Sequence, residues 1–425
     1  MTQLYRDRRF VTYWSGHAVS EFGDRVSELA LPLIAITALG ASSIEVGVLT
    51  GAVWAPQLLS LFIGAWVDQQ RHKRRLLIVS DLLQALALTT LPLVWWLGSL
   101  TLVQLLAVAL AVGVGRTLFQ TAYAPFFASL VTRDQYVEAN SLLGTTRSGS
   151  FVAGPALGGA LIQILSAPVA IVVDAVSFTF SAHMLRRVHV TERPPIDDAE
   201  ILFRRATQGF SYLWRHPYMA ASLRCCTTLN FFSFVVASLV VLYASRTLGL
   251  SAGAIGLAFG VGAVGGLAGA ALARRIGRRV GTGYTIAVGA ALFSAPYALV
   301  PLASGPCWAK AAVLALVEAI SGFGIMLFDI NLNALQTAVV HDDLRGRVSG
   351  AFATVNYGIR PLGALVGGVL GSVVGVGPTL VVAAVGGTLS FLWLTGSPII
   401  STKAIEDLKP NTQPPPPTPT NRNVL

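Results

Sequence analysis

The feature that most constrains this chain is a succession of long apolar segments separated by short polar loops. A segment of about 20 apolar residues is long enough for an α-helix to cross the hydrocarbon core of a bilayer. Only 12% of the residues are charged, about half the usual fraction in soluble proteins. This composition excludes a soluble enzyme, a disordered protein and a collagen-like chain, and it predicts an all-α membrane protein. Twelve spans are expected, at roughly 10–38, 44–66, 76–97, 101–131, 139–165, 168–187, 219–245, 253–273, 281–303, 309–336, 346–375 and 378–397.

The basic residues predict how these spans are oriented. Of the 30 Lys and Arg residues, 24 fall in one set of alternate loops or in the termini, whereas the other set holds only Arg246 and Lys310. Cytoplasmic loops carry such an excess of Lys and Arg. We therefore expect a multi-pass protein of the cell membrane with both termini in the cytoplasm. The net charge of +10 is spread over many loops, so a nucleic-acid partner is not expected.

One long loop divides the chain into two sets of six spans. Within it, Ile201 to Trp214 is expected to form an amphipathic helix with Arg204 and Arg205 on its solvent-exposed face. The Pro-rich C-terminal segment is typical of disordered chain. The expected domains are an N-terminal six-helix bundle at 1–187, a cytoplasmic linker at 188–218, a C-terminal six-helix bundle at 219–400 and a disordered cytoplasmic tail at 401–425.

The two halves carry similar loops at matching places, about 206 residues apart. The loop after the second span, at 64–75, matches the loop after the eighth, at 270–279. The loops before the fifth and eleventh spans match as well, at 133–141 and 341–349. These repeats indicate two six-helix bundles that arose by duplication. In transporters, such an arrangement places the substrate site near the midplane between the halves.

Three motifs resemble signatures of one known family, the major facilitator superfamily. The loop after the second span is similar to the family's G-x-x-x-D-R-x-G-R-R signature, from which it departs at Gln69, Arg71 and His72. The resemblance implies a cytoplasmic gate in which the acidic residue pairs with the second half and stabilises the outward-open state. Ordinary positive-inside topology is the alternative explanation for the cations. The residues assigned to this gate are Gly64, Asp68, Arg71 and Arg75.

The other two motifs lie inside spans. The segment 112–120 in the fourth span is similar to the family's buried-Arg motif, with Arg116 as its cation. The segment 150–159 resembles the G-x-x-x-G-P-x-x-G-G element of the antiporter branch, with Ser150 replacing the first Gly. This element implies export, a bend in the fifth span and close helix approach, with simple packing as the alternative. Its residues here are Gly154, Pro155, Gly158 and Gly159. With the segments 20–32, 209–217 and 360–363, these motifs resemble the branch of macrolide-efflux pumps and enterobactin-type exporters.

The first span carries Glu21, Asp24, Arg25 and Glu28 at steps that place them on one face of a helix. A charge facing lipid at mid-bilayer would cost at least about 2.5 kcal/mol, so this face is expected to line a cavity or meet a partner. Arg116 in the fourth span keeps its charge and needs a carboxylate partner. We predict that Asp24, Glu28 and Arg116 couple proton movement to transport, with Asp24 as the proton carrier. A fixed structural ion pair is the alternative.

Glu318 and Asp329 lie about three turns apart on one face of the tenth span, which the amide of Asn331 extends. They could contact substrate or act as a second protonation site, or they could pair structurally with Arg360 or Arg147. Asp174 in the sixth span is expected to be a paired structural residue. The candidates for the substrate cavity, from both halves, are Glu21, Arg25, Glu318, Asp329 and Asn331.

The chain contains no Walker loop, nucleophile elbow, H-E-x-x-H motif or Cys/His cluster. We therefore expect no enzyme activity, no cofactor and no metal site. The prediction is a monomeric secondary transporter that exports amphipathic organic molecules, such as an antibiotic or another secondary metabolite, in exchange for protons. Its expected partners are the small-molecule substrate, protons and the lipid bilayer. The alternatives are siderophore export and, further, proton-coupled uptake or facilitated transport of a small solute.

Overall fold

The computed structural model describes residues 4–132, 134–192, 199–404 and 408. Within this part of the chain, every regular element is helical and there is no strand. The α-helices are α1 (Arg8–Thr37), α2 (Ser43–Trp54), α3 (Ser60–Gln69), α4 (Lys73–Trp96), α5 (Leu102–Leu130), α6 (Tyr136–Leu165), α7 (Ala167–Arg187), α8 (Ala199–Arg215), α9 (Pro217–Leu242), α10 (Ala252–Val280), α11 (Thr282–Ser294), α12 (Cys307–Val339), α13 (Asp342–Gly358), α14 (Arg360–Val373), α15 (Val376–Thr388) and α16 (Leu392–Thr395). Short helices of other types are η1 (Leu4–Arg6), η2 (Ala55–Leu59), η3 (Tyr243–Thr247), η4 (Ala295–Leu302) and η5 (Leu389–Phe391).

Prolines explain why some expected spans consist of several short helices. Pro56 lacks an N–H group and lies in the first turn of η2, where α-helical hydrogen bonding changes to the 3₁₀ pattern before α3 begins. Pro296 has the same place in η4, which follows α11. The segments Ser43–Gln69 and Thr282–Leu302 are nevertheless each long and apolar enough to cross a membrane as one unit.

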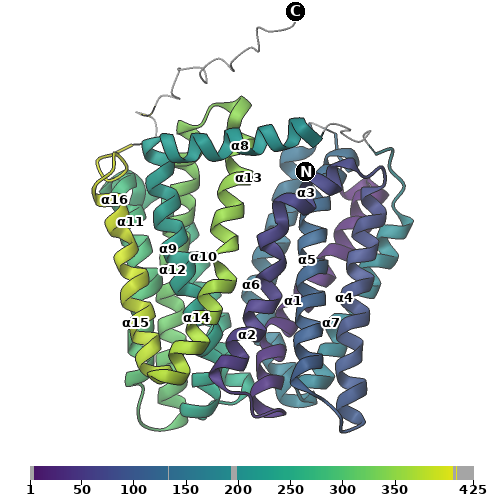
Figure 1. The fold of residues 1–425 in the computed structure, drawn as a ribbon, viewed down its shortest axis with the longest axis vertical. Helices are drawn as coiled ribbons and strands as arrows, with labels where there is room; N and C mark the ends of the chain where they lie inside the picture. The colour runs from purple at the N-terminus through teal and green to yellow at the C-terminus, as the bar shows by residue number, and fades with distance from the viewer. Residues whose placement is uncertain (1–3, 133, 193–198, 405–407, 409–425) are drawn as a thin grey trace, which may run out of the picture.

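Ten segments of the described chain are long and apolar enough to cross a membrane, and each overlaps a predicted span. The other two predicted spans correspond to α1 and to the pair α13 and α14, which run alongside the rest (Figure 1). Charged residues in α1, and the interruption at Ile359 between α13 and α14, keep these two outside the same criterion. The multi-pass membrane protein is confirmed, and the count of twelve spans stays a prediction.

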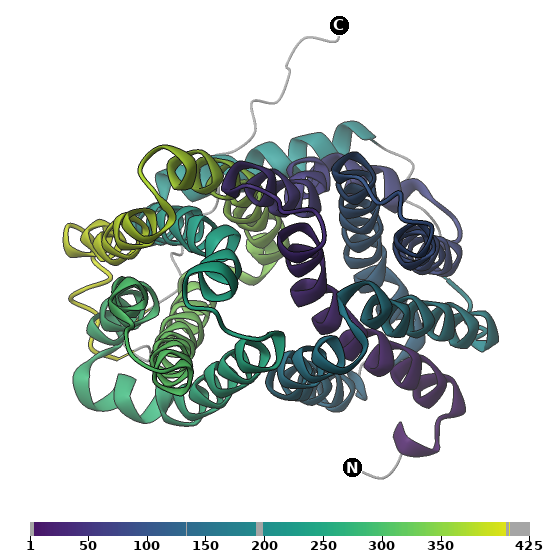
Figure 2. The ribbon, with the colours of Figure 1, turned by 90° about the horizontal axis from the view of Figure 1, so that it is seen from below.

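The helices form two groups, with α1 to α7 on one side and α9 to α16 on the other (Figures 1 and 2). Helix α8 crosses one end of the molecule, called here the linker end. It includes all the residues expected to form an amphipathic helix. The opposite end is called the hairpin end. The side chains of Arg204 and Arg205, and the tail from 409 onward, lie outside the described part of the structure. Residues 402 and 403, expected at the start of the tail, accept hydrogen bonds from the first N–H groups of α11.

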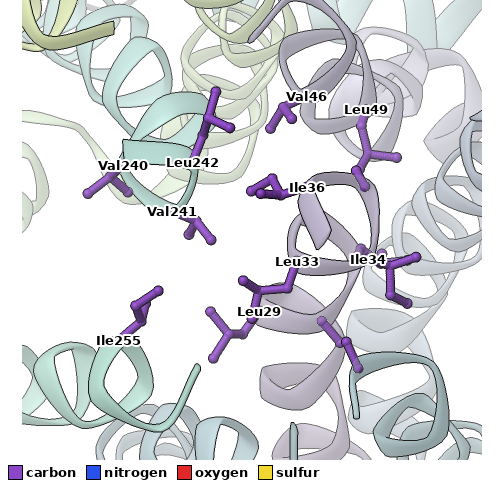
Figure 3. Close-up of a cluster of buried hydrophobic side chains, with 14 of the residues drawn as sticks. Leu29, Leu33, Ile34, Ile36, Val46, Leu49, Val240, Val241, Leu242 and Ile255 are labelled. Carbon is purple, nitrogen blue, oxygen red and sulfur yellow. The ribbon is translucent and has the colours of Figure 1, made fainter. Parts of the chain in front are cut away.

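Among the described residues, the buried apolar core joins the two groups at the hairpin end. There, one continuous cluster combines Leu33 of α1 and Leu49 of α2 with Val241 of α9 and Ile255 of α10 (Figure 3). Towards the linker end, the core divides into separate clusters, one within the first group and two within the second. The described helices are therefore packed shut at the hairpin end.

Glycines allow the two groups to touch backbone to backbone at this end. A Cβ atom on Gly47 of α2 would lie 2.8 Å from the Cα of Gly368 in α14. On the other side of the molecule, a Cβ on Gly256 of α10 would lie 2.4 Å from the carbonyl oxygen of Pro155 and 2.7 Å from the Cα of Gly159 in α6. Such small residues let membrane helices approach closely.

Candidate functional site

A cluster of charged side chains joins α1 to α5 within the first group. The Arg116 guanidinium of α5 lies 3.2 Å from a carboxylate oxygen of Asp24 and 3.3 Å from one of Glu28. Arg25 donates to the other oxygen of Glu28 at 2.7 Å. The i, i+4 spacing of Asp24 and Glu28 on α1 places both carboxylates within reach of one guanidinium. The sequence-predicted trio is thus brought together in the structure.

The two carboxylates differ in how strongly they are held. Asp24 has one cationic partner, whereas Glu28 bridges two. Protonating Asp24 would break a single ion pair, and protonating Glu28 would break two. The exposed fractions of these side chains are 14% for Arg116, 24% for Asp24 and 40% for Glu28. The charges are therefore paired and only partly buried.

Two glycines of the antiporter-like element pack against this charged part of α1. A Cβ on Gly154 would lie 2.4 Å from Cγ of Arg25, and one on Gly158 would lie 3.2 Å from the Cα of Val26. The Arg25 guanidinium lies 5.1 Å from the ring centroid of Phe151. Glu21 lies one turn before Arg25, with 4.0 Å between the charged atoms. Two glycines of the element thus accommodate α1, while the third faces α10.

A second layer of carboxyl groups lies behind Asp24, and sequence reasoning did not find all of it. Asp174 of α7 is fully buried and accepts hydrogen bonds from the hydroxyl groups of Ser27 and Ser177, with no cation within 4.0 Å among the described residues. The expected structural partners are therefore hydroxyls rather than a cation. Asp81 of α4 is 1% exposed, and its Oδ2 has no hydrogen-bond partner in the described chain. A lone acidic residue in an apolar segment gives no signal of its neighbours in the fold.

The predicted gate lies at the linker end, and its basic loop is bound to the chain segment that follows α7. The backbone N–H groups of Lys73 and Arg74, at the start of α4, donate to the carboxylate of Glu192, the second bond at 3.1 Å. The Arg74 side chain also donates to the carbonyl of Val188. This loop borders an open pocket of about 310 Å³, lined by Arg71, His72, Arg74, Arg75, His189, Val190 and Glu192. Sequence reasoning missed Glu192, whose role depends on the path of the chain after α7.

Lys73, next to the gate residues, and Gly64, one of them, have more ordinary surroundings. The Lys73 ammonium donates to the backbone carbonyls of Gln70 and Asp68 at 2.5 and 3.4 Å, which closes the turn after α3. A Cβ on Gly64 would meet Thr121 at an unstrained 3.5 Å. A pairing of Asp68 with the second half therefore stays a prediction.

The carboxylate of Glu192 is expected to stabilise the start of α4. An anion at a helix N-terminus contributes about 0.3–1 kcal/mol. Replacing Glu192 with Gln removes the charge but keeps a hydrogen-bond acceptor, so we expect the purified protein to lose up to about 1 kcal/mol of stability. Thermal unfolding at low and high salt measures this effect, which should shrink as salt is added. A loss that is the same at both salt concentrations would contradict the electrostatic explanation.

The candidate cavity residues of α12 divide into two kinds. Glu318 accepts a hydrogen bond of 3.1 Å from the Tyr297 hydroxyl, and Asp329 is partly buried. Neither forms an ion pair within 4.0 Å with Arg360 or Arg147, which was the structural alternative. Asn331 is 4% exposed and donates to backbone carbonyls of its own helix and of α10 at 2.8 and 3.4 Å. The structure places Asn331 between α12 and α10, and its role in a substrate cavity stays a prediction.

Two groups of membrane helices that pack together at one end, with paired charges inside the membrane segments, are typical of a membrane transporter. Within the described residues, no group of three or more His, Cys, Asp or Glu side chains could hold a metal ion. Residues 13–364 match the Major Facilitator Superfamily, and the chain belongs to that family.

Similar proteins agree with this assignment. The chain is 25% identical over 389 residues to the multidrug efflux pump Tap of Mycobacterium tuberculosis. The alignment covers 85% of this chain and 87% of Tap. It is 24% identical over 388 residues to the uncharacterized MFS-type transporter YfiS of Bacillus subtilis, covering 88% and 89% of the two chains. The crystal structure of a bacterial homologue of the iron transporter ferroportin in its inward-facing state has the same fold, with a TM-score of 0.71, 18% identity, and coverage of 91% of this chain and 99% of that chain.

Proposed function

We propose that this protein exports amphipathic organic molecules from the cell in exchange for protons, by alternating access between two six-helix halves. In this proposal α1 and the α13–α14 pair also cross the membrane, residues 1–187 and 219–400 form the two halves, and 188–218 link them. The excess of Lys and Arg at the linker end supports a cytoplasmic position for that end and for both termini.

The observation that carries the proposal is the bridge from Arg116 to Asp24 and Glu28. Deprotonated Asp24 neutralises Arg116, so the pair is stable in the state described here. When a proton binds Asp24, one ion pair is lost and the guanidinium keeps only Glu28. The protonation state of one accessible carboxyl group thereby changes the contact between α1 and α5, which is the kind of differential contact that can bias a conformational equilibrium.

The packing of the ends supports the order of the steps. In the proposed cycle, closure at the hairpin end belongs to a state that opens towards the cytoplasm, in which Asp24 is deprotonated and substrate enters. Reorientation would then expose the site to the outside, where substrate leaves and Asp24 binds a proton. Asp68, Arg71 and Arg75 would close the cytoplasmic end in that second state.

The similarity to Tap, whose name describes a multidrug efflux pump, favours export over uptake. The element from Ser150 to Gly159 favours the same direction, because it resembles the G-x-x-x-G-P-x-x-G-G element of the antiporter branch. Siderophore export and proton-coupled uptake or facilitated transport are the competing functions.

Everted membrane vesicles with an acid interior test the proposal. Macrolides, siderophores and cationic or anionic dyes are added one at a time, and a fluorescent probe follows the pH gradient. We expect at least one compound to dissipate the gradient only in vesicles that contain the protein. If no compound of a broad panel moves protons although the protein is present in the membrane, proton antiport is wrong. A compound that crosses the membrane in the same direction as the protons, rather than in the opposite direction, would indicate symport.

A further inference from the structure

An arginine of the second group lies in an aromatic cage at the junction of the two groups. Arg360 is the first residue of α14, directly after the interruption at Ile359. Its guanidinium carbon lies 4.3 Å from the ring centroid of Tyr357, 4.4 Å from that of Trp54 and 4.9 Å from that of Phe234. These rings come from α13, α2 and α9. Cation–π contacts of this kind offset part of the cost of placing a cation inside the membrane.

Hydrogen bonds fix the orientation of this guanidinium. Its Nε donates to the Asn230 side-chain oxygen at 2.9 Å, and the Asn230 amide donates in turn to Asn356 at 3.0 Å. The two terminal nitrogens, Nη1 and Nη2, make no hydrogen bond or ion pair with any described residue. A guanidinium held by Nε and open at both terminal nitrogens presents two parallel donors, which match a carboxylate, sulfonate or phosphate group.

Arg360 differs in this respect from the other two central arginines. Arg25 and Arg116 each bind carboxylates within 4.0 Å. Asp329 is an acidic neighbour of Arg360 in the described structure, yet it forms no ion pair with it within 4.0 Å. The N–H groups of Nη1 and Nη2 of Arg360 are therefore available to a ligand. An N-terminus of a discontinuous membrane helix, such as that of α14, adds a further favourable field for an anion.

The cage also borders the proton-coupling cluster. The Trp54 ring that faces Arg360 at 4.4 Å lies 5.9 Å from the guanidinium carbon of Arg116. A ligand at Arg360 would thus contact both groups of helices and lie one side chain away from the ion pairs of α1. This position suits a substrate site in an alternating-access transporter.

We propose that Arg360 binds the acidic group of the transported substrate, with Trp54, Phe234 and Tyr357 contacting its aromatic or apolar body. The substrates are accordingly organic anions or zwitterions rather than purely cationic amphiphiles. This inference rests on the proposed transport function and names the substrate class of that site.

Three probes with the same aromatic body and different head groups test the inference: pyrenebutyrate, pyrenebutanol and pyrenebutylamine. Binding to the full-length protein in nanodiscs is measured by calorimetry, and binding to empty nanodiscs is subtracted. We expect the butyrate to bind at least about tenfold more tightly than the butanol, because it gains a charge-assisted bidentate contact. Arg360→Gln should remove that preference while leaving the binding of the butanol within about threefold.

Two further variants separate positioning from charge and protect against misfolding. Arg360→Lys keeps the charge but loses the planar fork, so part of the preference should remain. Asn230→Ala leaves the guanidinium in place without its oxygen partner, so the butyrate preference should fall by a few fold. Equal binding of all three probes, tightest binding of the amine, no binding of any probe, or an unchanged preference in Arg360→Gln would overturn the inference.

The vesicle assay keeps the two proposals apart. If the wild type prefers the butyrate in nanodiscs but no compound dissipates the pH gradient, the anion site stands and proton antiport is wrong. If only neutral or cationic compounds dissipate the gradient, antiport stands and the assignment of Arg360 is wrong.

Discussion

Asp24→Asn is expected to reduce gradient-driven export to the level of vesicles without the protein. The amide can still accept a hydrogen bond from Arg116, but it carries no proton and does not neutralise the guanidinium. Substrate exchange without a pH gradient should continue, because Glu28 still holds Arg116 at 3.3 Å and the fold is unchanged. Counterflow of labelled substrate and dissipation of an imposed pH gradient, measured on the same vesicles, separate these two activities.

Asp7→Asn is the matched control on the same helix. Asp7 is the N-cap of α1 and accepts a hydrogen bond from the backbone N–H of Arg9 at 2.8 Å. Asn caps helices about as well as Asp, so this variant should export normally. If Asp24→Asn exports as well as the wild type, Asp24 is not the carrier, and Glu28 or Asp329 becomes the next candidate. Loss of both exchange and coupled export would instead point to a structural ion pair.

Much of this site could be predicted from the sequence because it depends on local spacing. The i, i+4 relation of Asp24 and Glu28 puts two carboxylates on one face of α1, and a cation inside an apolar span must find a carboxylate. Arg116 meets that requirement from the fourth span, at a depth similar to that of Asp24 and Glu28. The structure joins these three side chains for that reason.

The rest of the site depends on contacts between segments that are distant in the sequence. Nothing in the sequence near Trp54 indicates that Arg116 and Arg360 both lie near its ring. Glu192 caps α4 only because the chain after α7 returns to that helix. Asn331 was grouped with Asp329 because both lie on one helix face. The sequence did not indicate that α10 packs against Asn331.

The fold was predicted for a similar reason, because apolar length alone decides which segments can cross a membrane. Ten segments meet that criterion, and α1 fails it through the very charges that make it a functional candidate. The sequence could predict that the glycines of the antiporter-like element allow close packing. It could not predict that neighbouring glycines contact different helices. Gly158 meets α1, whereas Gly159 meets Gly256 on α10 in the other group.

The contact between Gly159 and Gly256 predicts a large loss of export in Gly256→Val. A Cβ at this position would lie 2.4 Å from a backbone oxygen and 2.7 Å from a backbone carbon of α6, so no side chain can move aside to make room. The two helices must separate, and closure of the hairpin end loses stability by about 1–3 kcal/mol or more. We expect export to fall by at least about tenfold, because the state that loads substrate is then rarely populated.

Gly253→Val is the matched control, since it adds the same side chain to α10 where the nearest atoms would lie at 3.7 Å. A cysteine replacing Leu33, which is 3% exposed in the hairpin-end cluster, reports opening once exposed Cys307 has been replaced. In Gly256→Val this reporter should react faster with a membrane-impermeant maleimide added from the hairpin side, and in Gly253→Val it should stay protected. Normal export together with a protected reporter in Gly256→Val would show that the contact between α6 and α10 does not govern closure. Faster labelling together with lost export would make the backbone contact between these helices a determinant of the transport cycle.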